Sequence, residues 1–180
     1  MSNLYELPLD AGNADAVNAV IEVPMGDTNK YEYDPKLELF RLARKFGVSV
    51  HYPGNYGFIP STLGVNGKPL AVLVLASAPS FTGCLVEVRP IGLLEVSDEG
   101  VHEAKVVAVG KHSPRFKDVL EISQAPQHLV REIAAFFSMY KDLDATSSEA
   151  VAWYGVEDTW TAIRHAHAEF AKGASGGRSA

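Results

Sequence analysis

The first two thirds of the chain alternate short apolar runs with turn-forming residues. Residues 70–75 are nearly all apolar, as in a strand buried on both faces, whereas residues 30–33 alternate polar and aromatic side chains, as in a half-exposed strand. Turn signals recur roughly every 8–12 residues, which is typical of a small barrel or sandwich. The expected strands span 17–23, 30–33, 48–52, 70–75, 84–90, 91–96 and 105–109.

The last third of the chain has a different period. Residues 129–140 and 157–171 place apolar side chains three and four positions apart, the pattern of amphipathic helices with one face on a core. The Gly/Ser-rich segment 173–180 is expected to be a disordered tail. The pattern therefore predicts a mainly β, α+β fold, with a barrel packed by two C-terminal helices in a single domain over residues 1–172.

Charge and composition narrow the function classes. The 180 residues include 16 Lys and Arg against 22 Asp and Glu, for a net charge of -6. This balance argues against a broad nucleic-acid-binding surface, although it leaves room for a small basic pocket. No apolar stretch reaches the ~20 residues of a membrane span. One cysteine, Cys84, excludes an internal disulfide. We expect a cytoplasmic protein without nucleic-acid or membrane partners.

Four segments, in order and spacing, resemble the soluble, Mg-dependent (family I) inorganic pyrophosphatases. They read IEVP at 21–24, KYE at 30–32, HYPGNYGFIP at 51–60 and FFSMYKDL at 136–143. The resemblance covers about residues 16–170. It implies a five-stranded OB-like barrel with flanking helices, Mg as cofactor and pyrophosphate or phosphate as ligand. In bacterial members it also implies a homohexamer.

The resemblance also implies a set of anion-binding side chains. Lysine and arginine suit phosphate, because they offer point charges and paired N–H donors. By alignment to the family motif, the substrate-binding residues are Lys30, Glu32, Arg44, Tyr56, Lys105, Tyr140 and Lys141, with Glu22 and Tyr52 nearby.

The metal-binding part of the family pattern is altered. Where the family has Asp-Gly-Asp-Pro-x-Asp, this chain has Asn66, Lys68 and Ala71 in place of the three aspartates. Lys68 falls where the family's proposed general base lies, and an ammonium group cannot accept a proton at neutral pH. In the second carboxylate group of the family, Asp98 is retained and Glu103 replaces an aspartate, so both are possible metal ligands.

These replacements make the pocket four charge units more positive than the family pattern without metal, which equals the charge of two Mg²⁺ ions. We hypothesise that Lys68 replaces part of the missing metal charge. The Asn66-Gly67 pair is also a strong hairpin-turn signal, and this role is compatible with every functional alternative.

Three functions follow from these patterns. The first is a catalytically impaired family member that binds phosphate- or pyrophosphate-type anions in a basic pocket. The second is an active Mg-dependent pyrophosphatase with a rearranged site that uses Glu22, Glu32, Asp98 and Glu103. The third is a non-catalytic subunit that assembles with an active homologue.

Overall fold

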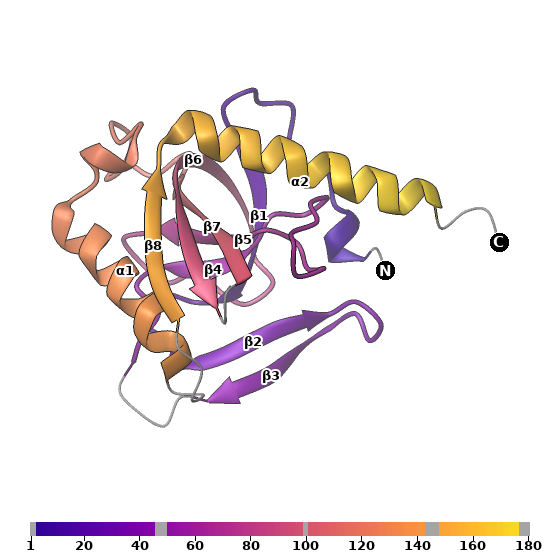
Figure 1. Cartoon of the computed structure of the whole chain (residues 1–180), viewed down its shortest axis with the longest axis horizontal. Coiled ribbons are helices and arrows are strands. Elements are labelled where there is room, and N and C mark those ends of the chain that lie inside the picture. The colour runs from indigo at the N-terminus through magenta and orange to yellow at the C-terminus, as the bar shows by residue number, and fades with distance from the viewer. Residues whose placement is uncertain (1–2, 46–49, 99–100, 143–147, 177–180) are drawn as a thin grey trace.

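The structure is a computed structural model that describes residues 3–45, 50–98, 101–142 and 148–176 (Figure 1). Short 3-10 helices span Leu4–Glu6 (η1) and Ile122–Gln124 (η2). The α-helices are α1 (Gln127–Asp142) and α2 (Val156–Gly176). The strands are β1 (Val17–Val23), β2 (Asn29–Asp34), β3 (Leu39–Lys45), β4 (Asn55–Phe58), β5 (Ala71–Leu75), β6 (Leu85–Asp98), β7 (Val101–Gly110) and β8 (Ser148–Tyr154).

Five strands close into a ring, which confirms the expected barrel. Their order is β1-β4-β5-β7-β6, and β6 pairs back with β1. The pairs are antiparallel except β5 with β7, which run parallel. Strand β8 extends the sheet beside β6. A closed ring leaves fewer unpaired strand edges than an open sheet.

The apolar residues of β5 point alternately to two hydrophobic clusters. Leu73 belongs to a cluster that includes Ile133 of α1, and Val72 belongs to a cluster that includes Ile163 of α2. All four side chains are fully buried. The two helices therefore cover opposite faces of the same strand, which explains why residues 71–75 are apolar without alternation.

One predicted strand is wrong. Residues 50–52 of the expected strand 48–52 have no strand conformation, and residues 46–49 lie outside the described part of the chain. Tyr52 instead makes two isolated backbone hydrogen bonds, donating to Asp27 O at 3.1 Å and accepting from Gly26 N at 2.9 Å. Pro53 has no N–H with which to continue this pairing. The strand of this region is β4, which begins at Asn55.

Other boundaries differ from the expectation. The segments 84–90 and 91–96 form one strand, β6, because a register shift between Pro90 and Gly92 carries the strand past the proline. Strands β3 and β8 were not expected. Helix α2 continues through Gly176, into the segment expected to be disordered. Residues 177–180 lie outside the described residues.

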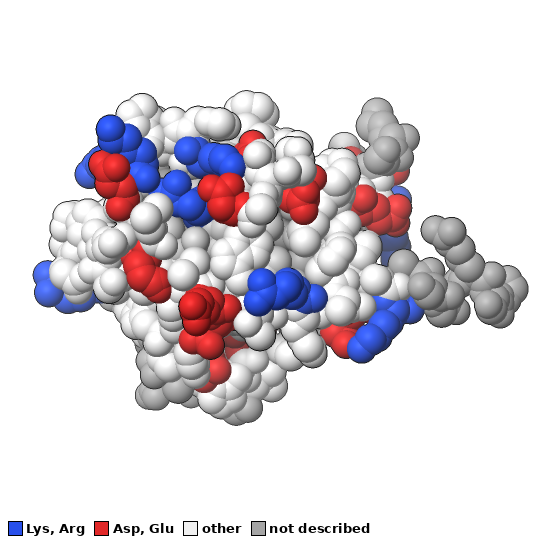
Figure 2. Space-filling model, turned by 90° about the horizontal axis from the view of Figure 1, so that it is seen from above, with Lys and Arg blue, Asp and Glu red and all other residues white. Residues whose placement is uncertain are grey.

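A second, two-stranded sheet of β2 and β3 lies beside the barrel (Figure 1). Its residues and those at the barrel rim line a common cavity, so the two sheets together position the site. On the face that carries α2, acidic and basic side chains lie among one another (Figure 2). No helix in the described part of the chain combines the length and apolar character needed to cross a membrane.

Candidate functional site

A cavity of about 850 Å³ lies between the barrel rim and the β2–β3 sheet. It receives side chains from β1, β2, β3, β4, β5 and β7 and from the loop that leads into β5. It brings together nine of the residues named from the sequence: Glu22, Lys30, Glu32, Tyr56, Asn66, Lys68, Ala71, Glu103 and Lys105.

Strand geometry places the charged groups in pairs. Lys30 and Glu32 are two residues apart on β2, and Glu103 and Lys105 are two residues apart on β7. Because side chains alternate along a strand, each pair projects from one face of its strand. Lys105 stands beside Ala71 of the parallel neighbour β5. The barrel rim and the β2–β3 sheet therefore each supply one lysine–glutamate pair.

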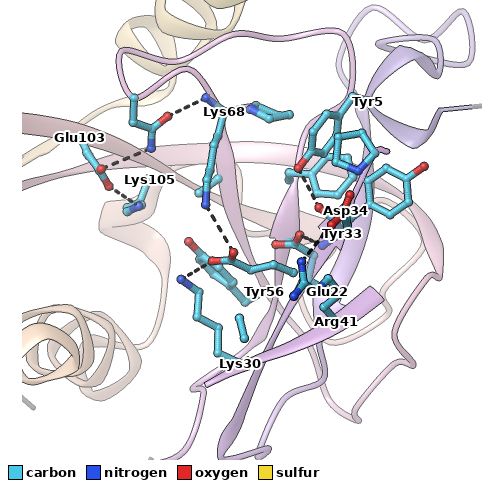
Figure 3. A pocket seen from close by; sticks show the side chains of 18 of the residues that line it. Tyr5, Glu22, Lys30, Tyr33, Asp34, Arg41, Tyr56, Lys68, Glu103 and Lys105 are labelled. Atoms are coloured by element: carbon cyan, nitrogen blue, oxygen red, sulfur yellow. Dashed lines mark hydrogen bonds and ion pairs between the residues drawn. The ribbon is translucent and has the colours of Figure 1, made fainter. Parts of the chain in front are cut away.

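The loop before β5 is a hydrogen-bonded turn, as the Asn-Gly pair predicts. Gly67 has a φ of 74°, a conformation that glycine adopts without strain. Lys68 N donates to Asn66 Oδ1 at 3.0 Å, and Gly64 N donates to Lys68 O at 2.7 Å. These bonds fix the backbone of the loop and direct the Lys68 side chain across the cavity toward β2 (Figure 3).

The carboxylates at this end of the cavity are engaged by ammonium groups (Figure 3). Glu32 contacts Lys30 Nζ at 2.6 Å through one oxygen and Lys68 Nζ at 3.4 Å through the other. Glu103 contacts Lys105 Nζ at 2.7 Å and accepts from the Asn66 amide at 3.3 Å. The three lysines at this end of the cavity thus face two paired carboxylates, instead of forming a bare cluster of cations.

These pairs set the protonation of both acids. Burial raises the pKa of Glu32, but the hydrogen bond and charge of Lys30, together with Lys68, outweigh burial and lower the pKa. Burial likewise raises the pKa of Glu103, and the charge and hydrogen bond of Lys105 reverse this and lower it. Both carboxylates are therefore ionised at neutral pH and hold the lysines in place.

Glu22 on β1 titrates differently. Burial is the main cause that raises its pKa to about 7, and the charge of Glu32 adds to the effect. The backbone N–H of Tyr33 donates to Glu22 Oε1 at 2.9 Å and acts in the opposite direction. Burial, followed by the charge of Glu22, raises the pKa of Tyr5 to about 12. The cavity therefore changes charge near neutral pH through Glu22.

The other named residues are not placed in this lining. Arg44 lies on β3 in register with Lys30 but is not among the described lining residues. Tyr52 is buried, with its ring against Tyr56 and Phe136. The side chains of Asp98, Tyr140 and Lys141 lie outside the described residues, so their predicted roles stay predictions.

The end of the cavity next to η1 was not predicted from the sequence. Tyr5, Tyr33, Asp34 and Arg41 line it, and they come from η1, β2 and β3. The Tyr5 hydroxyl donates to Tyr33 O at 3.1 Å, and Arg41 contacts Asp34 at 3.2 Å. The alternation of residues 30–33 was a signal for one face of β2, but no pattern near Tyr5 indicated its long-range packing.

Comparison with known proteins identifies the family. The sequence profile described as inorganic pyrophosphatase matches residues 19–171. The inorganic pyrophosphatase of Geobacillus stearothermophilus is 42% identical over 141 residues, covering 78% of this chain and 86% of the relative. The chain belongs to the inorganic pyrophosphatase family.

Further relatives match nearly the whole chain. The inorganic pyrophosphatase of Thermus thermophilus is 41% identical over 172 residues, covering 96% of this chain and 98% of the relative. A crystal structure of inorganic pyrophosphatase from that organism superimposes with a TM-score of 0.90 over 94% of this chain and 99% of that chain, at 39% identity. The barrel and its two helices are therefore those of the inorganic pyrophosphatase family.

Inorganic pyrophosphatases of this family depend in general on Mg²⁺. Mg²⁺ takes hard oxygen ligands, chiefly carboxylates and waters. Among the described residues, no three His, Cys, Asp or Glu side chains are grouped so that they could hold a metal ion. Glu32 and Glu103 are bound by ammonium groups, and Ala71 offers no donor atom. The described lining does not fit a Mg²⁺ cluster.

Proposed function

We propose that the protein binds inorganic pyrophosphate and phosphate in this cavity and hydrolyses pyrophosphate slowly or not at all. Three ammonium groups, those of Lys30, Lys68 and Lys105, line one end of the cavity beside Tyr56. Ammonium and phenolic groups donate hydrogen bonds to phosphate oxygens, and the ammonium groups also neutralise the charge of the ligand. The membership of the inorganic pyrophosphatase family supports pyrophosphate as the ligand.

The observation that carries the proposal of slow hydrolysis is the engagement of Glu32 and Glu103 by lysines. Hydrolysis requires a group that takes a proton from water, and such a group contributes typically about 10²–10⁴-fold to the rate. The resemblance places the family's base at the position of Lys68, whose ammonium contacts Glu32 and cannot accept a proton. A carboxylate held by an ammonium group is also a poorer base, because the pair stabilises its ionised form.

A second candidate is an active Mg-dependent pyrophosphatase. It is favoured by the 41% identity to the Thermus thermophilus inorganic pyrophosphatase over 96% of this chain. Three carboxylates, Glu22, Glu32 and Glu103, also line the cavity. In this alternative, Glu32 and Glu103 exchange their lysine partners for metal ions.

Phosphate release from pyrophosphate separates these two functions. The assay is run with Mg²⁺ and with Mn²⁺, beside the Thermus thermophilus inorganic pyrophosphatase as a reference. We expect the unmodified protein to be at least about 100-fold slower than the reference. The triple variant Asn66→Asp, Lys68→Asp, Ala71→Asp is expected to be faster than the unmodified protein, because it restores three oxygen ligands.

The matched control is Lys172→Asp, which reverses the charge of an exposed lysine that pairs with Glu169 on α2 and does not line the cavity. It is expected to leave the rate of phosphate release unchanged. Circular dichroism and thermal melting show whether each variant is folded. Turnover of the unmodified protein equal to that of the reference would establish the second candidate instead.

We also propose that the chain forms a homo-oligomer, which by resemblance to bacterial members is a hexamer. Light scattering on the purified protein gives the subunit number directly. Native mass spectrometry after mixing with an active homologue tests the third function, a non-catalytic subunit, because it resolves oligomers of different subunit composition. Mixed oligomers would support co-assembly, and two separate populations would exclude it.

A further inference from the structure

Two features distinguish Lys68 from the other lysines at its end of the cavity. Its contact with Glu32 is long, at 3.4 Å, whereas Lys30–Glu32 and Lys105–Glu103 are 2.6 and 2.7 Å. Its side chain is 61% exposed, against 22% for Lys30 and 11% for Lys105. Lys68 is therefore the loosest partner in the group, although it contributes the same charge.

We infer that Lys68 is a resident counter-ion of the site. In the free protein its ammonium group pairs with Glu32. When an anion binds, the ammonium group moves to an oxygen of that anion, so that phosphate-type anions bind without a divalent cation. This inference rests on the function proposed above, which supplies the ligand. It adds which group neutralises the ligand and what that group contacts when the ligand is absent.

The loop allows this transfer without a change of fold. Its backbone is fixed by the bonds from Lys68 N to Asn66 and from Gly64 N to Lys68 O. Four methylene groups separate the Lys68 ammonium from this anchored backbone, so the charge can move while the turn stays in place. Glu32 keeps Lys30 at 2.6 Å when Lys68 leaves, so the buried part of the carboxylate remains paired.

The donor atoms of the lining favour an anion over a divalent cation. The Asn66 amide oxygen already accepts from Lys68 N, and its nitrogen donates to Glu103. A cation placed near Glu32 would meet the ammonium groups of both Lys30 and Lys68. An anion at the same place would instead meet two groups of opposite charge, and it would compete with the Glu32 carboxylate for them.

Titration calorimetry tests the inference. Pyrophosphate and inorganic phosphate are each titrated into the protein in EDTA and, separately, in excess Mg²⁺. Phosphate is included because Mg²⁺ also complexes free pyrophosphate. We expect the unmodified protein to bind in EDTA, with a phosphate dissociation constant within about threefold of that in Mg²⁺.

Variants assign the effect to Lys68. In EDTA, Lys68→Met is expected to weaken binding by about tenfold or more, the usual loss for a charge-assisted hydrogen bond. Lys68→Arg, which keeps the charge, is expected to restore most of the affinity. Glu32→Gln is expected to tighten binding, because it removes the carboxylate that competes with the ligand. Lys172→Met, the matched control on α2 outside the cavity, removes another exposed lysine that pairs with a glutamate and is expected to change affinity less than twofold.

The outcomes separate this inference from the proposed function. Binding that requires Mg²⁺, or equal affinities of Lys68→Met and Lys172→Met in EDTA, overturns the inference and leaves the proposed function standing. No binding of either anion under any condition overturns the proposed function itself. Thermal melting of each variant without ligand excludes loss of fold as the cause of weak binding.

Discussion

Strand β5 and the loop that leads into it are adjacent in the sequence, but different forces hold them. Residues 72–75 of β5 are at most 2% exposed and pair with β4 on one side and β7 on the other. Residues 65–68 of the loop are exposed, and the loop keeps its shape through backbone hydrogen bonds and the positive φ of Gly67. Buried side chains and pairing on both edges hold the strand, whereas local hydrogen bonds, one of them to the Asn66 side chain, hold the loop.

This difference separates similarity of fold from similarity of chemistry. A buried strand tolerates few substitutions, because each one changes packing on both faces. An exposed loop with a fixed backbone accepts Asn66, Lys68 or other side chains at little cost in folding free energy. Identity of about 42% to an inorganic pyrophosphatase therefore establishes the family and its barrel, while the ligand proposed above depends on a few side chains at the rim.

The largest expected effect concerns the packing of strands in the barrel. A methyl group on Gly57 of β4 would overlap the carbonyl oxygen of Val20 and lie 2.9 Å from the Cα of Ile21. Because β1 and β4 pair at this point, Gly57→Ala must push the two strands apart. We expect it to lower the free energy of unfolding by at least about 4 kcal/mol, measured by urea denaturation.

Gly67→Ala in the loop is the matched control. No atom lies within 4 Å of the added methyl group, and the cost is only that of an alanine at a φ of +74°. This amounts to about 1 kcal/mol. Equal losses for the two glycine variants would contradict the distinction between strand and loop.

The second prediction concerns Glu22, which lies on the barrel strand β1 and lines the cavity. Its pKa is about 7 in the folded protein, above the unfolded value, so the fold favours its protonated form. The stability that this proton contributes is complete below the unfolded pKa and is lost as pH rises through 7. Glu22→Gln, which cannot ionise, should therefore exceed the unmodified protein in stability by about 3 kcal/mol at pH ~8 and match it near pH ~4.

Urea denaturation at these two pH values measures the difference. Glu32→Gln provides a control of opposite sign, because the pKa of Glu32 is lowered in the fold. Its ionised form contributes stability above the unfolded pKa, and that contribution is lost as pH falls. Glu32→Gln should therefore lose stability at high pH. A Glu22→Gln advantage that is the same at both pH values would show that burial does not shift the titration of Glu22.

The sequence predicted the parts of the fold that depend on local pattern. The apolar run that became β5 and the two amphipathic helices were found because packing against one core imposes a period on the residues. Strand β4 was not predicted because it contains Asn55 and Gly57, and both residue types are common in turns. Gly57 allows β1 to approach β4 closely. Its partner Ile21 is 36 residues away in the sequence, so this contact leaves no local signal.

Several residues named from the sequence line the cavity, but their pairing was not predicted. Alignment to the family motif placed Glu32, Lys68 and Lys105 near the same ligand, and all three line the cavity. The inference of a simply basic pocket missed that Glu32 holds two lysines at once. That contact joins β2 to the loop before β5, and it depends on the register of two separate sheets, which residue spacing along one chain does not specify.

The smallest expected effect concerns the loop before β5. Lys68→Met removes an ion pair whose lysine is largely exposed, and such pairs contribute about 0–1 kcal/mol to stability. We expect the free energy of unfolding without ligand to change by less than about 0.5 kcal/mol, measured by urea denaturation at low ionic strength. Lys36→Met, in the neighbouring hairpin turn, should give the same result within error. A loss above about 1.5 kcal/mol for Lys68→Met alone would mean that the loop needs this charge to fold. A negligible loss, together with weakened anion binding, would mean that Lys68 acts on the ligand and not on the loop.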